Sequence, residues 1–138
     1  MPESLHSRRL RFEFQELAWV ALGAVPGALL RWQSAERLGP WIGGSAGSDL
    51  LVNLIGSFVL GFLAGPIPYR TNLVLLLGIG FCGCLTTFSS WMLDVVKLMR
   101  AGASAEALLL IVVSLALGLL FAAGGLLSSR RLFRARSV

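Results

Sequence analysis

The sequence contains few of the residues on which enzymes and metal sites depend. His6 is its single histidine, and Cys82 and Cys84 are its two cysteines. A zinc site needs about four nitrogen or sulfur ligands in a tetrahedral arrangement, and covalent catalysis needs a nucleophile beside a base. Neither set is available, so we expect neither a metal cluster of this kind nor an enzyme. The two cysteines are interpreted as small packing residues.

Charged residues are also scarce. They make up 14% of the 138 residues, whereas 56% are hydrophobic, and a soluble domain is usually about a quarter charged. The hydrophobic residues form four blocks, each close to the roughly 20 residues with which a helix crosses a bilayer. The sequence therefore predicts a single all-α integral membrane domain, residues 1–138, with four transmembrane helices. The expected spans are about 17–38, 50–67, 73–99 and 105–127, between basic tails at 1–16 and 128–138.

The first block reaches membrane-spanning length only if it includes a charged residue. Its uncharged part, from Leu17 to Leu30, is too short to span a bilayer, so the helix must continue through Arg31 to Leu38. Arg31 is therefore expected inside the membrane or at its edge. An ionisable side chain at such a depth is costly and often has a function.

Acidic residues are outnumbered by basic ones, and the net charge is +5. The basic residues flank the predicted spans and form no single folded surface, which argues against a nucleic-acid partner. Four spans place both tails and the 66–72 loop on the same side of the membrane. That side is the more basic one, so the positive-inside rule puts both termini in the cytoplasm. It carries Arg8, Arg9, Arg11, Arg70, Arg130, Arg131, Arg134 and Arg136, against Arg31, Arg37, Lys97 and Arg100 on the other side.

Small and polar residues recur every four positions in three of the predicted helices. Residues at this spacing share one helix face, and faces of small residues let membrane helices pack closely. Packing explains the glycines, but Asn53 and Ser114 are polar, and polar groups within a membrane need a partner or a watery path. We therefore expect a functional role for Asn53. The stripes are Gly23, Gly27 and Arg31; Asn53, Ser57, Gly61 and Gly65; and Ser114, Gly118 and Ala122.

The third block has an unusual centre, GFCGCLTTFSSW at residues 80–91. Glycine and threonine disfavour a helix there, which predicts a break at Gly83–Thr87. Carbonyls freed by a break must be buried in protein or line a cavity, and they suit a cation that prefers oxygen ligands. The alternative is a continuous helix whose hydroxyls bond to the preceding turn. Phe88 and Trp91 follow on one helix face, and their positive ring edges can support a small anion.

Three motifs in this sequence resemble those of the Fluc (CrcB) fluoride channels. They are GAVPGALLRW at 23–32, NLIGSFVLG at 53–61 and GFCGCLTTFSSW at 80–91, and the four-helix layout extends the resemblance over nearly the whole chain. The resemblance implies an antiparallel, dual-topology dimer in the bacterial inner membrane, with two narrow fluoride paths. It also implies passive export of fluoride from the cytoplasm, relief of fluoride toxicity and a structural Na⁺ at the dimer centre.

The resemblance further implies roles for individual residues. The backbone carbonyls of Gly83 and Thr86 would hold the Na⁺. The fluoride path would be formed by Asn53, Thr87, Phe88, Trp91 and Ser114, together with Arg31, which ends the first motif.

Four positions depart from the family pattern. Trp91 occupies the position of a second phenylalanine in the family, Leu110 that of a common tyrosine and Cys84 that of a second glycine. Asp49 stands for a threonine, and its carboxylate would repel an anion if it faced the path. Together with the arginine bias, these departures leave open a second arrangement, in which this chain is one subunit of a heterodimeric channel.

Two other classes of membrane protein remain as alternatives. A small multidrug-type exporter needs an ionisable carboxylate inside its first span, and no acidic residue lies between Leu17 and Leu30. A purely structural membrane protein would account for the glycine stripes. It would not account for the TTFSSW segment in the middle of the third span.

Overall fold

The structure of the protein, a computed structural model, describes residues 5–67 and 70–134. Its helices are α1 (Leu5–Arg37), the 3₁₀ turn η1 (Gly39–Trp41), α2 (Ser45–Leu63), α3 (Arg70–Leu73), the π-helical stretch η2 (Val74–Cys82), α4 (Gly83–Leu85), α5 (Ser89–Arg100) and α6 (Ser104–Arg134). Within the described residues, three helical segments are long and apolar enough to cross a membrane: Ser45–Leu63, Thr71–Arg100 and Ser104–Phe133. The predicted class, an all-α protein that passes through the membrane more than once, is confirmed.

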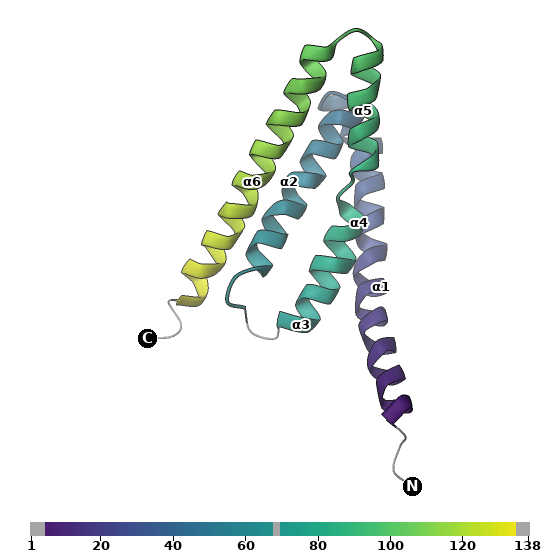
Figure 1. The fold of residues 1–138 in the computed structure, drawn as a ribbon, viewed down its shortest axis with the longest axis vertical. Coiled ribbons are helices and arrows are strands. Elements are labelled where there is room, and N and C mark those ends of the chain that lie inside the picture. The colour runs from purple at the N-terminus through teal and green to yellow at the C-terminus, as the bar shows by residue number, and fades with distance from the viewer. Residues whose placement is uncertain (1–4, 68–69, 135–138) are drawn as a thin grey trace.

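The helices form a bundle in which segments distant in the sequence lie side by side. α2 packs along α6, and α1 packs along η2 and α4 (Figure 1). The first turn of α1 and the last turn of α6 lie at the same end of the bundle as the connection that follows α2, whereas the α5–α6 turn lies at the opposite end (Figure 1). This arrangement agrees with the expectation that both ends of the chain share one side of the membrane.

Several helix bounds differ from the expected spans. α1 begins at Leu5, within the segment predicted as a tail, because Arg, Glu and Leu are good helix formers and no glycine or proline interrupts them. α6 likewise continues to Arg134. α1 is not among the three apolar segments, so the fourth span stays a prediction. The outermost tail residues, 1–4 and 135–138, and positions 68–69 of the 66–72 loop lie outside the described residues.

The bounds of α2 are set by glycine and proline. The helix starts at Ser45, directly after Gly44, whose φ of +78° is readily adopted only by glycine. It ends at Leu63, three residues before Pro66, which cannot continue a helix. The helix therefore begins five residues before the start of the expected span, 50–67, and ends four residues before its end.

The glycine stripes do pack helices backbone to backbone, as predicted. A Cβ atom added at Gly23 would collide with the carbonyl oxygen of Leu76 in η2, and one at Gly27 with the carbonyl oxygen of Phe81. Across the other interface, a Cβ atom at Gly61 of α2 would collide with the carbonyl oxygen of Ala122 in α6. These contacts fix α1 against η2 and α6 against α2.

Replacing Gly23 with alanine is expected to destabilise the protein by about 1–3 kcal/mol, because the new methyl group has no space beside the Leu76 carbonyl. The matched control is Gly124→Ala in α6, where no atom lies within 4 Å of the added Cβ. There alanine should leave stability unchanged or raise it by about 1 kcal/mol through helix propensity. Thermal unfolding in detergent measures both variants, and equal melting temperatures would contradict the packing described for α1.

Candidate functional site

The third apolar segment is interrupted near its middle. α4 ends at Leu85, Thr86 is extended with φ −73° and ψ 153°, and helical structure resumes at Ser89 as α5. The break therefore comprises Thr86, Thr87 and Phe88. The predicted break is present, but it begins later than the expected Gly83–Thr87, because Gly83 and the two residues after it are still helical. η2, which precedes the break, has the wider π-helical form, a feature that recurs at functional sites.

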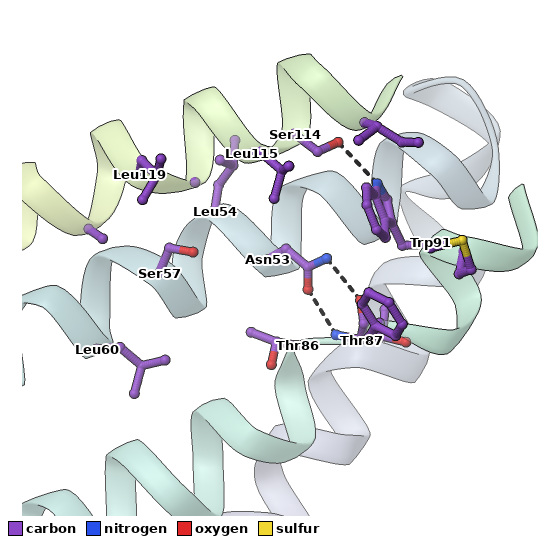
Figure 2. A pocket seen from close by; sticks show the side chains of 15 residues that line it. Asn53, Leu54, Ser57, Leu60, Thr86, Thr87, Trp91, Ser114, Leu115 and Leu119 are labelled. Atoms are coloured by element: carbon purple, nitrogen blue, oxygen red, sulfur yellow. Dashed lines mark hydrogen bonds between the residues drawn. The ribbon is translucent and has the colours of Figure 1, made fainter. Parts of the chain in front are cut away.

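The break is held in place by one side chain of α2. The Asn53 Nδ2 atom donates to the carbonyl oxygen of Thr87 at 3.0 Å, and the Thr87 backbone N–H donates to Asn53 Oδ1 at 2.8 Å (Figure 2). Three residues along α2, Gly56 has no side chain, and a Cβ atom there would collide with the Thr86 Cγ2 atom. α2 thus provides both the polar partner and the space that the extended segment requires.

Two backbone amides after α4 are diverted from their helical partners. In a continuous helix the Thr87 N–H would donate to the carbonyl of Gly83, four residues earlier, but here it donates to Asn53. In the same way, the Ser90 N–H donates to Thr87 Oγ1 at 3.3 Å instead of to the carbonyl of Thr86. The carbonyls of Gly83 and Thr86 consequently lack the donors that a helix would give them. The Thr86 hydroxyl itself bonds back to the Cys82 carbonyl at 2.8 Å.

A cavity of about 670 Å³ opens beside the break, between α2, α5 and α6. Its polar lining consists of one amide and four hydroxyl side chains, while the rest of its surface is apolar (Figure 2). Among the described residues that line it, none carries a charge. The polar members are Asn53, Ser57, Thr86, Thr87 and Ser114.

Two aromatic side chains form the wall next to the break. The ring centroids of Phe88 and Trp91 are 5.7 Å apart, with the planes tilted by 48°. Trp91 is 8% exposed and packs with Val95 and Ala107, and its Nε1–H donates to Ser114 Oγ at 3.1 Å (Figure 2). Phe88 is 70% exposed. The indole is therefore fixed in the bundle, whereas the phenyl ring has few neighbours within this chain.

The structure gathers most of the sequence-predicted site residues around this one cavity. Arg31 and Gly83 do not line it. Leu110, at the position of a common tyrosine, packs against the cluster around Trp91, and Cys84 is partly buried near the break without lining the cavity. The residues brought together are Asn53, Thr86, Thr87, Phe88, Trp91 and Ser114.

Some site features were not anticipated from the sequence. Ser57 and Gly118 line the cavity, and both belong to predicted stripes that were assigned to packing. Asp94 is buried close to the same end of α2 as Asp49, with a hydrogen bond to Ser45 at 2.9 Å. Asp94 comes three residues after Trp91 and so shares its helix face. This spacing could have identified Asp94 as a residue near the site from the sequence.

Comparison with known proteins identifies a family that this chain matches. The model of that family, described as CrcB-like protein, Camphor Resistance (CrcB), matches residues 18–126. A protein named fluoride-specific ion channel FluC 2 from Synechococcus sp. (strain CC9902) is 52% identical over 132 residues, which are 96% of this chain and 92% of that relative. The FluC 2 of Parasynechococcus marenigrum (strain WH8102) is 54% identical over 123 residues, 89% of this chain and 87% of the relative.

The same Parasynechococcus strain has a second relative, named fluoride-specific ion channel FluC 1. It is 37% identical to this chain over 113 residues, 80% of this chain and 90% of the relative. The names of these relatives indicate a channel rather than an enzyme. With the family model covering most of the chain and relatives that align over nearly their whole length, this chain belongs to the CrcB-like family.

Proposed function

We propose that this chain forms a fluoride channel that lets fluoride leave the cytoplasm and so reduces fluoride toxicity. The observation that carries the proposal is the uncharged polar lining of the cavity beside the break. A small anion needs donors to replace its water, and a fixed positive charge in a dry path would bind it too tightly for release. Fluoride is the anion in the name of the relative that is 52% identical to this chain.

The donors in the cavity suit this task. An asparagine amide has two N–H groups, and Asn53 uses one for the Thr87 carbonyl, which leaves the other for an anion. The hydroxyls of Ser57 and Ser114 lie along the cavity. The Ser114 oxygen accepts from Trp91, so its own hydrogen is free to donate. The edges of Phe88 and Trp91 add partial positive charge without a fixed cation. Arg31 lies outside the cavity, and we assign it to the entrance of the path.

The working unit in this proposal is an antiparallel dimer in the bacterial inner membrane. Phe88 supports it, because a ring that is 70% exposed within one chain gains its packing from a second copy. The arginine distribution supports termini in the cytoplasm for one orientation of the chain. Lipid surrounds the remaining apolar surface, which includes much of α6.

We further propose that the carbonyls of Gly83 and Thr86 hold a structural Na⁺ near the dimer centre. Their fit to the ion rests on the two diverted amides, which leave these oxygens without helical donors. Carbonyl oxygens are hard ligands that suit such a cation. The ion would join the break to its counterpart in the partner and hold the two broken helices in register.

A heterodimer is the second arrangement that a specific observation favours. Two organisms among the relatives, Parasynechococcus marenigrum (strain WH8102) and Prochlorococcus marinus (strain MIT 9313), each have proteins named FluC 1 and FluC 2. This chain is more similar to the FluC 2 protein of the first organism than to its FluC 1 protein. A chain held in one orientation by its arginines would need a partner inserted in the opposite sense.

Fluoride efflux from liposomes that contain only this protein tests the proposal. We expect rapid loss of internal fluoride, measured with a fluoride electrode, and no comparable loss of chloride. Liposomes without protein set the baseline. Baseline fluoride efflux from the protein alone, and also from the protein reconstituted together with a FluC 1-type chain of the same organism, would contradict the proposed function. Efflux only from the mixture would establish the heterodimer.

A further inference from the structure

A second polar cluster lies at the end of α2 nearest to η1, outside the cavity. Its carboxylates, Asp49 of α2 and Asp94 of α5, are only 5% and 6% exposed. Asp94 Oδ1 accepts from Ser45 Oγ at 2.9 Å and from Lys97 Nζ at 3.0 Å. Ser45 and Asp49 are four residues apart and share the face of α2 that meets Asp94. The two acids therefore approach each other across the α2–α5 interface.

One oxygen of each carboxylate is unsatisfied. Among the described residues, no hydrogen-bond partner reaches the buried atoms Asp49 Oδ2 and Asp94 Oδ2. Buried acceptors without donors are costly, and buried carboxylates are more so unless a counter-charge binds them. Two such atoms, on carboxylates close enough to interact electrostatically, would both be satisfied by a group that supplies the missing positive charge.

The surrounding charges define what that group is. α5 brings Lys97, whose side chain is 60% exposed and, among the described residues, bonds to Asp94. α1 brings Arg31, which acts on Asp49 at longer range, with no ion pair between them within the described residues. One of the two negative charges is therefore matched by a direct contact and the other is not. Lys97 and Arg31 both act on Asp49, but only through space. A small positive charge in direct contact with the Asp49 carboxylate would complete the cluster.

We propose that Asp49 and Asp94 together bind one small monovalent cation, either a proton or Na⁺, between their Oδ2 atoms. The oxygen of Ser48 is a further hard ligand nearby, since this hydroxyl is buried and donates its hydrogen to the Ser45 carbonyl. A divalent ion is a poorer match, because Lys97 already offsets one carboxylate. The described residues also hold no group of three or more His, Cys, Asp or Glu side chains that could bind a metal ion.

The site has a consequence for the cavity that rests on the proposed function. Asp49 precedes Asn53 by one helical turn on the same face of α2, a separation of about 6 Å along the axis. Without a bound cation, the Asp49 charge would raise the energy of fluoride at Asn53. The cation removes this penalty, so a chain with aspartate at position 49 can still conduct an anion.

Thermal unfolding of the purified full-length protein tests the site without any use of fluoride. Wild type is compared with Asp49→Asn in choline chloride at pH 8, first with added NaCl and then with the pH lowered to 5.5 in choline alone. A saturating cation should raise the wild-type melting temperature by roughly 5–10 °C. A rise with NaCl identifies Na⁺, and a rise only on acidification identifies the proton. Asp49→Asn should lack whichever rise in melting temperature the wild type shows, with NaCl or on acidification.

The matched control is Glu106→Gln, which makes the same chemical change at an exposed position of α6 and should keep the full response. If Asp49→Asn fails to fold, Asp94→Asn takes its place, because it removes the other carboxylate of the pair. In the proton case, infrared spectroscopy should also show a protonated carboxyl band in wild type that either variant loses. Responses in wild type that both aspartate variants retain would overturn the site. Such a retained Na⁺ response would belong to the Gly83 and Thr86 carbonyls.

Discussion

Replacing Phe88 with isoleucine is expected to reduce fluoride efflux from proteoliposomes to the level of protein-free liposomes, with the fold unchanged. The ring is 70% exposed within the chain and lies beside the cavity at the break. Its removal therefore costs little packing energy in the monomer. It does remove a positive ring edge that would support an anion in a cavity whose described lining residues carry no charge. Efflux is measured with a fluoride electrode, and folding by size-exclusion chromatography and circular dichroism.

Leu119→Val is the matched control for Phe88. Leu119 also lines the cavity and is 73% exposed, so its substitution changes the apolar volume without touching an aromatic ring. This variant should retain efflux within a few-fold of wild type. Wild-type rates in Phe88→Ile would show that the ring serves packing between subunits and has no part in conduction.

Replacing Asn53 with leucine should abolish efflux and also destabilise the protein. Both hydrogen bonds between Asn53 and the Thr87 backbone are lost, at 3.0 and 2.8 Å. A buried hydrogen bond to a neutral group contributes about 1 kcal/mol, and a partner left unsatisfied costs about 1–3 kcal/mol. We therefore expect a loss of about 2–4 kcal/mol in the free energy of unfolding. Chemical denaturation followed by tryptophan fluorescence measures it.

Ser57→Ala separates this effect from a general loss of polarity in the cavity. Ser57 is one turn from Asn53 on the same face of α2 and lines the same cavity. Its substitution leaves the Thr87 contacts intact, so stability should change by less than about 1 kcal/mol. If Asn53→Leu unfolds at the same denaturant concentration as wild type, Asn53 does not hold the break, and its role is limited to the anion.

Helix existence was predictable from the sequence because the apolar blocks are long and the charges between them are few. Helix ends were less predictable. Arg and Glu near the chain termini are good helix formers, so α1 and α6 extend beyond the apolar blocks that mark a membrane span. The π-helical register of η2 had no signal in the sequence. This stretch packs against α1, where a Cβ atom added at Gly80 would collide with the Val20 carbonyl oxygen.

The candidate site was predictable where local chemistry decides the structure. The two threonines and the glycines before them indicated the break, and the four-residue spacing identified Asn53 and Ser114. The hydrogen bonds between residues on different helices could not be predicted from the sequence. That Asn53 binds the Thr87 backbone and Ser114 accepts from Trp91 depends on how α2 and α6 meet the third segment. The resemblance supplied roles for single residues, whereas the contacts between them came from the structure.

The polar residues of α2 also constrain how its length can vary. Ser45 meets Asp94 and Asn53 meets Thr87, two turns apart on one face, with Asp49 between them. One inserted residue turns a helix by about 100°. An alanine inserted between Asp49 and Asn53 would swing Ser45 and Asp49 away from Asp94 while leaving Asn53 on the break. Insertion and deletion variants of this short stretch can therefore separate both α2 members of the acidic cluster from Asp94 while the cavity keeps Asn53. A single substitution removes only one member of that cluster.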